Sequence, residues 1–129
     1  TIGVKGFKCL IQNLVNMKVD KIFLSGNNVG VGNPEKLFLE LQNMQLKILD
    51  LSFNKIDDKT LISLTQALPR SKLSILDLSY NRIGLEGLKN LGGLLPKTQI
   101  NKINLKGNNI NIKTQEYFRK QFSFIEWIF

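Results

Sequence analysis

Two pairs of carboxylates have the residue type and spacing for acid–base chemistry. Asp57 and Asp58 are adjacent, and Asp50 and Asp77 hold the same place in two copies of the run LDLS. Paired carboxylates hydrolyse glycosidic bonds when one acts as acid and the other as base or nucleophile. Asp57 and Asp58 also suit the start of a helix, where an acidic side chain caps free backbone N–H groups. The helix-start role is the simpler explanation of that pair.

Other catalytic chemistries lack their usual residues. The 129 residues contain no histidine and a single cysteine, Cys9, which excludes Ser–His and Cys–His catalysis, histidine-liganded metals and an intrachain disulfide. We predict that Cys9 is a small, partly buried apolar residue of a first helix. The sequence therefore predicts no enzyme, no catalytic residue, no metal and no cofactor.

A glycine-rich stretch at residues 26–32 suggests a loop that binds phosphate, because free amides at a helix start bind anions. The stretch lacks the Gly-Lys-Ser/Thr ending and the third spaced glycine of the two common nucleotide motifs. We interpret it as a turn between two elements.

Composition favours one folded domain. Apolar residues make up 43% of the chain and charged residues 22%, and no apolar run approaches the roughly 20 residues that span a bilayer. The net charge of +8 permits an acidic partner but is spread along the chain. The lone cysteine, the lack of Asn-x-Ser/Thr sites and the lack of a signal peptide in residues 1–17 favour a cytoplasmic location.

A repeated segment dominates the middle of the chain. The segments VDKIFLSGNNV, LKILDLSFNKI, LSILDLSYNRI and INKINLKGNNI start 27 residues apart, at Val19, Leu46, Leu73 and Ile100. Apolar residues two apart in each segment have the spacing of a strand with one buried face. Four short parallel strands are therefore expected, one from each repeat.

The second half of each repeat has helical spacing instead. Leu61, Leu64 and Leu68 recur one repeat later as Leu88, Leu91 and Leu95, at steps of three and four. Predicted boundaries are an Asn33 cap with Pro34 as the first helical residue, a start at Asp57 and Asp58, and ends before Pro69 and Pro96. The helix with Gly87, Gly92 and Gly93 is expected to be the weakest.

The unit LxxLxLxxNxL resembles the leucine-rich repeat, and its period is similar to the ribonuclease-inhibitor-like subclass. The resemblance implies an α/β solenoid, a short right-handed arc with parallel strands on the concave face and helices on the convex face. It also implies that the recurring asparagine forms a ladder, which agrees with the ability of one amide per repeat to satisfy loop backbone groups. The ladder residues are Asn27, Asn54, Asn81 and Asn108.

We divide the single domain, residues 1–129, into a half-repeat or cap helix at 1–18, repeats at 19–45, 46–72 and 73–99, and a last repeat with a C-terminal cap at 100–129. The predicted core positions at the two ends are Phe7, Leu10, Leu14, Phe118, Phe122 and Ile125. The apolar end Trp127–Phe129 is expected to cap the last repeat; the alternative is that it anchors a missing segment or a partner. The start at Thr1 fits either a natural half-unit cap or a chain that lacks earlier residues.

Outward-pointing positions should align in columns on the concave face. We predict that the protein-binding residues occupy four places of the motif: the third and fifth on the strand, and the eighth and tenth just past it. These residues are Lys21, Phe23, Ile48, Asp50, Phe53, Lys55, Ile75, Asp77, Tyr80, Arg82, Lys102 and Asn104. Aromatic and aliphatic residues inside a charged rim are typical of a protein interface. Strand alternation favours binding for Ile48 and Ile75; Phe53 and Tyr80 fit binding and packing on neighbouring loops equally well.

The resemblance implies a noncatalytic module that binds a protein and inhibits or regulates an enzyme by covering its active site. The short chain, rich in Asn, Lys and Ile, also resembles small leucine-rich-repeat effectors of intracellular bacteria such as Legionella. This resemblance implies that the protein acts in the host cytosol on a partner that is an enzyme or another effector. Neither a small-molecule substrate nor a membrane is expected. Two alternatives remain: a docking fragment of a larger protein, and weak nucleic-acid binding through Lys102, Lys106, Lys113, Arg119 and Lys120.

Overall fold

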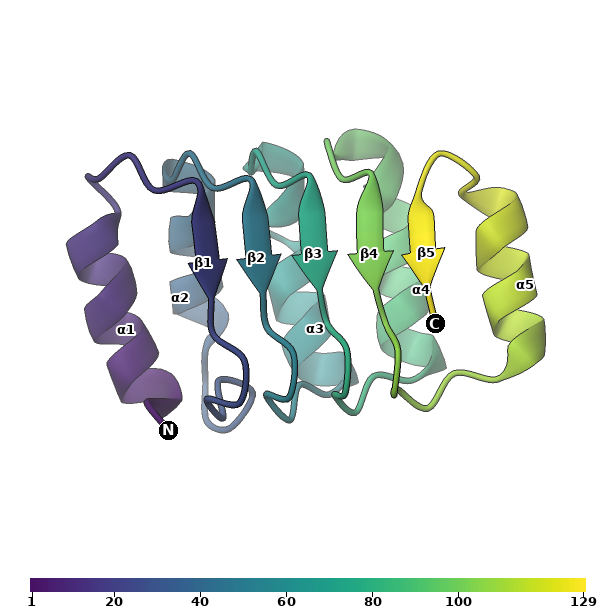
Figure 1. Ribbon diagram of the computed structural model, residues 1–129, viewed down its shortest axis with the longest axis horizontal. Coiled ribbons are helices and arrows are strands. Elements are labelled where there is room, and N and C mark those ends of the chain that lie inside the picture. The colour runs from purple at the N-terminus through teal and green to yellow at the C-terminus, as the bar shows by residue number, and fades with distance from the viewer.

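The chain alternates short strands with helices along its whole length (Figure 1). The computed structural model describes residues 1–129, except for the side chain of Leu37. The strands are β1 (Lys21–Phe23), β2 (Ile48–Asp50), β3 (Ile75–Asp77), β4 (Lys102–Asn104) and β5 (Glu126–Ile128). The α-helices are α1 (Gly3–Leu14), α2 (Glu35–Glu40), α3 (Asp58–Thr65), α4 (Leu85–Leu94) and α5 (Ile112–Gln121). Short 3₁₀ turns follow three of them: η1 (Leu41–Asn43), η2 (Leu68–Arg70) and η3 (Leu95–Lys97).

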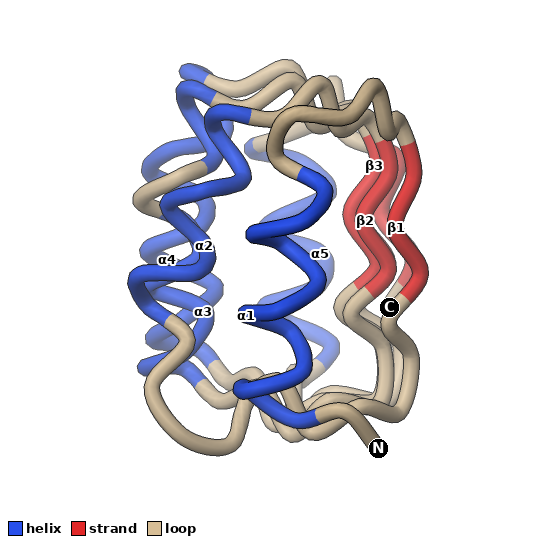
Figure 2. Tube along the Cα trace, turned by 90° about the vertical axis from the view of Figure 1, so that its left-hand side faces the viewer, coloured by secondary structure: helices blue, strands red, loops and turns tan.

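The strands form one parallel sheet in the order β1-β2-β3-β4-β5. Its register follows the repeat, so that Lys21 lies beside Ile48, Ile48 beside Ile75 and Ile75 beside Lys102. Figure 2 shows the strands in one layer and α2, α3 and α4 in another, whereas α1 and α5 lie at the two ends of the sheet in Figure 1. The α/β solenoid predicted from the repeats is confirmed.

The core lies between these two layers. Leu49, Leu76 and Ile103 occupy the middle of successive strands and are fully buried, as are Leu64 and Leu91 on the inner faces of α3 and α4. Removing one such side chain from water contributes about 2 kcal/mol, and each repeat buries its residues against the next. None of the described helices combines the length and apolar character needed to cross a membrane.

The ladder asparagines satisfy backbone groups between repeats. They are Asn27, Asn54, Asn81 and Asn108. The Asn54 Oδ1 accepts from the N–H groups of Asn27 and Val29, each at 3.0 Å, and its Nδ2 donates to the carbonyls of Leu24 at 2.7 Å and Ser52 at 2.9 Å. Asn81 makes the equivalent bonds one repeat later, and Asn54 and Asn81 are both buried. One amide therefore satisfies strand-end groups of its own and the preceding repeat.

Two helix starts differ in how they are capped. The Asp57 carboxylate accepts from the backbone N–H of Thr60 at 2.8 Å and caps α3, at the predicted place. The predicted cap at Asn33 is wrong, because α2 begins at Glu35 and the flanking residue is Pro34, with no side-chain hydrogen bond. Pro34 has ψ near 1°, outside helical geometry, so the helix starts one residue later than the proline rule indicates.

Close packing explains two glycines of α4, which forms a ten-residue helix despite them. A Cβ on Gly87 would lie 2.6 Å from the Asp58 carboxylate, and one on Gly92 would lie 3.0 Å from the rings of Phe118 and Phe122. Packing against neighbouring repeats thus outweighs the weak helix propensity of glycine.

The predicted core positions of the first helix are buried to different extents. Phe7 is fully buried in α1, Leu10 and Leu14 are partly buried and pack against the core, and Ile11, which was not predicted, is fully buried. Cys9 is exposed rather than partly buried, so the prediction for this residue is wrong. The helix buries the face at Phe7 and Ile11, one turn apart, and this face leaves Cys9 in solvent.

The C-terminal residues form a fifth strand that the repeat motif did not predict. Ile103 of β4 lies beside Trp127 of β5, and the N–H of Leu105 donates to the carbonyl of Ile128 at 2.6 Å. Trp127 is buried, and its ring meets that of Phe118 edge to face at 5.7 Å. The aromatic end thus covers the last repeat as both a strand and a ring cluster.

We predict that Asn81→Ala lowers the free energy of unfolding by about 3 kcal/mol. The change removes the side-chain amide that is hydrogen-bonded at 2.9–3.2 Å to buried backbone N–H and carbonyl groups, and leaves those groups without a partner. Urea denaturation measures this loss. The matched control is Asn109→Ala, an exposed asparagine of the last repeat, with an expected change below about 0.5 kcal/mol. Equal stabilities of the two variants would contradict the role of the ladder.

Candidate functional site

The strand register lines up the predicted binding positions in two columns. The third motif place gives the column Lys21, Ile48, Ile75, Lys102, which β5 extends with Glu126; the fifth gives Phe23, Asp50, Asp77, Asn104, extended by Ile128. We call the surface made by these columns and by the loop rings Phe53 and Tyr80 the sheet face. Figure 1 looks onto it, with α2, α3 and α4 behind the sheet.

The sheet face carries large apolar side chains in contact with solvent. Phe23 is 67% exposed, Phe53 54% and Tyr80 43%. Ile48 and Ile75 are half-buried at the start of β2 and β3, and Asp50 and Asp77 at the strand ends separate them from the loop rings. The central repeats therefore present an aliphatic and aromatic surface.

Charged residues surround this apolar centre on some sides only. Lys21 is exposed at one edge of the sheet, and Lys102 pairs with Glu126 at 3.4 Å on the other side. Lys55 and Arg82 were predicted to belong to the same rim, but they line a separate depression of about 360 Å³ at the loop edge, next to residues that precede and begin α2 and α3. The structure thus brings the strand columns together and places these two cations beside them.

The two loop rings have an unusual backbone that the sequence motif alone did not indicate. Phe53 and Tyr80 have φ of 54° and 53°, in the left-handed region that favours glycine. The same motif place in the first and last repeats is Gly26 and Gly107, with φ of 73° and 74°. Those two glycines were the available signal for a left-handed position. The rings stack at 4.4 Å with planes 10° apart, so they pack on each other and still face solvent.

Asp50 and Asp77 shape the turns that follow their strands. The Oδ1 atom of each accepts from the backbone N–H two residues on, of Ser52 and Ser79, at 2.8 Å. Asp77 also accepts from the Ser79 hydroxyl at 2.6 Å and from Asn104 Nδ2 at 2.9 Å. These bonds account for the recurring LDLS run without acid–base catalysis.

Asp57 and Asp58 also have structural partners. The N–H of Thr60 donates to Asp57 and holds the pKa of that carboxyl below its usual value, although partial burial acts in the opposite direction. Asp58 accepts from the backbone N–H of Gly84 at 2.7 Å and so connects α3 to the start of α4. The two carboxylates are adjacent in sequence but bind at different helix starts: Asp57 caps α3, and Asp58 accepts from the residue before α4.

The glycine-rich stretch has a packing role as well. A Cβ on Gly30 would lie 2.7 Å from backbone atoms of Lys55 and Ile56, so only glycine fits against the next repeat. The following helix, α2, has six residues. The loop is a repeat-to-repeat contact, as the interpretation as a turn requires.

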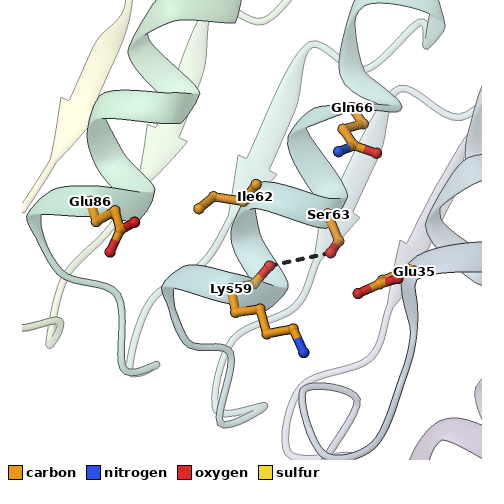
Figure 3. Close-up of a pocket in the computed structure, with 6 residues that line it drawn as sticks. All are labelled: Glu35, Lys59, Ile62, Ser63, Gln66 and Glu86. Carbon is orange, nitrogen blue, oxygen red and sulfur yellow. Dashed lines mark hydrogen bonds between the residues drawn. The ribbon is translucent and has the colours of Figure 1, made fainter.

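A depression of about 380 Å³ lies on the opposite side, across α2, α3 and α4 (Figure 3). Glu35 and Glu86 come from different helices on either side of α3, and the Ser63 hydroxyl donates to the Lys59 carbonyl at 3.2 Å. The hydroxyl of this serine is hydrogen-bonded within its own helix. Among the described residues, no group of three or more His, Cys, Asp or Glu is placed to hold a metal.

Comparison with known families agrees with this architecture. The model of the leucine-rich-repeat family matches residues 42–64 and 71–92, which hold the second and third motifs. The molecule is a leucine-rich-repeat solenoid. Comparison with curated protein sequences gives no match for it.

Solved structures share the fold of the solenoid. Leiomodin-1 actin-binding site 2 is 14% identical with a TM-score of 0.71, and the match covers 95% of this chain and 77% of that one. A leucine-rich-repeat protein of Leptospira interrogans is 27% identical with a TM-score of 0.56, over 86% of this chain and 25% of that one. The solenoid thus spans a quarter of the length of the Leptospira protein.

We predict that Asp57→Ala lowers the free energy of unfolding at pH 7 by about 1 kcal/mol, because α3 loses its capping carboxylate. The folded pKa of Asp57 is depressed, so its extra stabilisation is present above the unfolded pKa of about 3.9 and is lost as the pH falls through the folded value. Urea denaturation between pH 7 and pH 2.5 should therefore show the two curves converging in acid.

Asp20→Ala is the control for this change, because Asp20 is exposed and lies outside any helix. Its stability should stay within about 0.5 kcal/mol of wild type. A gap between Asp57→Ala and wild type that persists unchanged at pH 2.5 would show that the carboxylate charge has no part in the cap.

Proposed function

We propose that the solenoid is a noncatalytic module that binds a partner protein with its sheet face. The observation that carries this proposal is the apolar side chains of that face: Phe23, Phe53 and Tyr80 are 43–67% exposed, and Ile48 lies beside Ile75 on the same face. Grouped aromatic and aliphatic side chains on a surface mark a site of association, and such residues dominate the energy of protein interfaces.

The size of the sheet face fits a compact interface. Parallel strands lie about 4.8 Å apart, so five strands span about 20 Å. A standard interface buries about 800 Å² on each partner, which requires the strands and the loop rings to act together. The partner therefore contacts several repeats at once.

We further propose that the bound partner is an enzyme or an effector whose functional site the sheet face covers, in the manner of ribonuclease-inhibitor-like repeats. Support comes from the 27-residue strand–helix period and from the name of the leiomodin-1 region, which describes binding to a protein, actin. The likeness to a Leptospira protein supports a bacterial source. A cytoplasmic site of action, in a host if the protein is delivered as an effector, remains part of this proposal.

A second candidate is a docking segment of a longer protein. The match to only 25% of the Leptospira chain favours it. Nucleic-acid binding through the last repeat is less well supported, because two of its five cations are engaged: Lys102 pairs with Glu126, and Arg119 lies over the ring of Phe129 at 4.9 Å.

The test is affinity capture with wild-type protein and with the double variant Ile48→Arg, Ile75→Arg. Two arginines at the centre of the sheet face place unpaired charge in the interface, so we expect the partner to be lost, a fall in affinity of at least 100-fold. Mass spectrometry identifies what each bait retains, and thermal unfolding verifies that the variant is folded.

The matched control is Ser63→Arg, Gln66→Arg on α3, which adds the same charge to the helix side. It should capture the partner as wild type does. If the Ile48 and Ile75 variant is too unstable, Phe23→Ser replaces a ring that is 67% exposed and should weaken binding at least tenfold. Equal recovery of every protein by all folded baits would reject the sheet face as the binding surface.

A further inference from the structure

We propose that the free face of the Phe53 ring, next to Gly26 and Asp50, is a slot for an arginine side chain of the partner protein. This inference rests on the proposed function for the source of the arginine. The slot itself follows from three features of the second repeat: a one-sided ring stack, an aromatic residue in a glycine conformation, and a carboxylate oxygen without a protein partner.

The ring stack is closed at one end and open at the other. Gly26, Phe53, Tyr80 and Gly107 hold the same place in successive repeats. One face of Phe53 stacks on Tyr80, and Tyr80 in turn lies so close to Gly107 that a Cβ there would overlap its ring. At the other end, a Cβ on Gly26 would have no atom within 4 Å. The space at the Gly26 end is therefore open, and Phe53 remains 54% exposed although one face of its ring is stacked.

The backbone at Phe53 shows that the ring is not placed there for ease of folding. A residue with a side chain at φ 54° is strained by on the order of 1 kcal/mol, and the first and last repeats avoid this strain with glycine. Stacking on Tyr80 offsets a similar amount. The net result is a ring that is 54% exposed, with little gain for the fold and with its exposed surface available for contact.

The carboxylates of Asp50 and Asp77 differ although they occupy equivalent places. Asp77 uses both oxygens: Oδ1 accepts from Ser79, and Oδ2 accepts from Asn104 in the next repeat. The residue that lies beside Asp50 in the next repeat is Asp77 itself, which has no proton to donate.

The serine two residues after each aspartate also behaves differently in the two repeats, because in the second repeat its hydroxyl does not donate to the aspartate. Ser52 donates its hydroxyl to Ser25 at 2.8 Å instead of to Asp50. In the part of the chain that the structure describes, Asp50 accepts only the Ser52 N–H, through Oδ1. Its Oδ2 is thus free for a donor from outside, beside the exposed ring of Phe23.

A planar cation matches this combination best. A guanidinium group stacks on an aromatic ring and donates N–H bonds to a carboxylate at its edge. An ammonium group has no plane to stack, a phenylalanine ring would cover Asp50 without a donor, and the single neutral donor of a tyrosine or tryptophan does not match the carboxylate's charge. The same chain places a guanidinium over an aromatic ring where Arg119 lies over Phe129 at 4.9 Å.

The exposed Lys21 and Lys55 lie two residues from Phe23 and Phe53 and oppose a cation. We therefore expect weak binding of an isolated arginine, with a dissociation constant on the order of 10 mM. The surrounding sheet face supplies the rest of the affinity for a partner.

The test is a titration of ¹⁵N-labelled protein with N-acetyl-arginine amide, followed by NMR. We expect saturable shifts at the amides of Gly26, Asp50 and Phe53, and at least threefold weaker binding of N-acetyl-lysine amide at equal ionic strength. Cytidine monophosphate is a third probe, because a base could also stack on Phe53 and donate an amino group to Asp50. Saturation by the nucleotide but not by arginine would overturn the proposal in favour of nucleic acid.

The equivalent carboxylates provide the matched control. Asp50→Asn keeps the shape and the turn acceptor but removes the charge, so arginine binding should fall at least fivefold. Asp77→Asn should leave it within twofold of wild type, because that carboxylate is already occupied. No saturable shift at Gly26 and Phe53, or equal binding by wild type and Asp50→Asn, would overturn the slot.

The outcome is separable from that of the proposed function. If Asp50→Asn keeps full affinity for the captured partner while Ile48→Arg, Ile75→Arg loses it, the sheet face stands and the arginine slot is wrong. If arginine saturates the slot but neither change affects the partner, free arginine binds there but the slot does not hold an arginine of that partner, and the sheet face is not where that partner binds.

Discussion

The loop that leaves each strand depends on the next repeat for its hydrogen bonds. Asn54 accepts from Asn27 and Val29 of the preceding repeat, and Asn81 does the same for Asn54 and Ile56. Buried amides left without acceptors cost 1–3 kcal/mol each. An insertion within the strand and the loop that follows it would move the asparagine out of reach, which explains why the asparagine keeps the ninth place in each motif.

That same constraint builds the sheet face. Because the repeats are held in register, any residue at an outward strand place lies beside its equivalent in the next repeat, as Ile48 lies beside Ile75. Outward residues are not needed for the ladder or the core, so they can vary with the partner. The fold thus fixes the positions of the columns, and the choice of Phe, Ile, Asp or Lys at each place determines what the face binds.

Features that repeat along the chain could be predicted from the sequence. Strand places, the columns and the cap at Asp57 all follow from periodicity and from residue preference. Features that depend on one local contact could not. The strand at Glu126–Ile128 has no motif of its own and forms because β4 offers an unpaired edge. The bond from Gly84 to Asp58 joins two repeats through a side chain whose type fits a helix cap equally well.

The candidate site shows the same division. The alignment of Ile48 with Ile75 is periodic, but the left-handed backbone of Phe53 and Tyr80 is visible in the sequence only through the glycines at the equivalent places. The difference between Asp50 and Asp77 depends on which residue comes next in the column, an asparagine or an aspartate. A motif treats these two aspartates as equal, whereas the hydrogen bonds distinguish them.

The central claim is that the partner covers the sheet face, and side-chain footprinting by hydroxyl radicals tests it most directly. Tyr80 and Tyr117 are 43% and 58% exposed in the free solenoid, and Tyr117 lies on α5 in a depression shared with Leu85 and Lys89 of α4. In the complex with the captured partner, oxidation of Phe53 and Tyr80 should fall severalfold while that of Tyr117 stays unchanged. Protection of Tyr117 with Phe53 and Tyr80 still fully reactive would contradict the account.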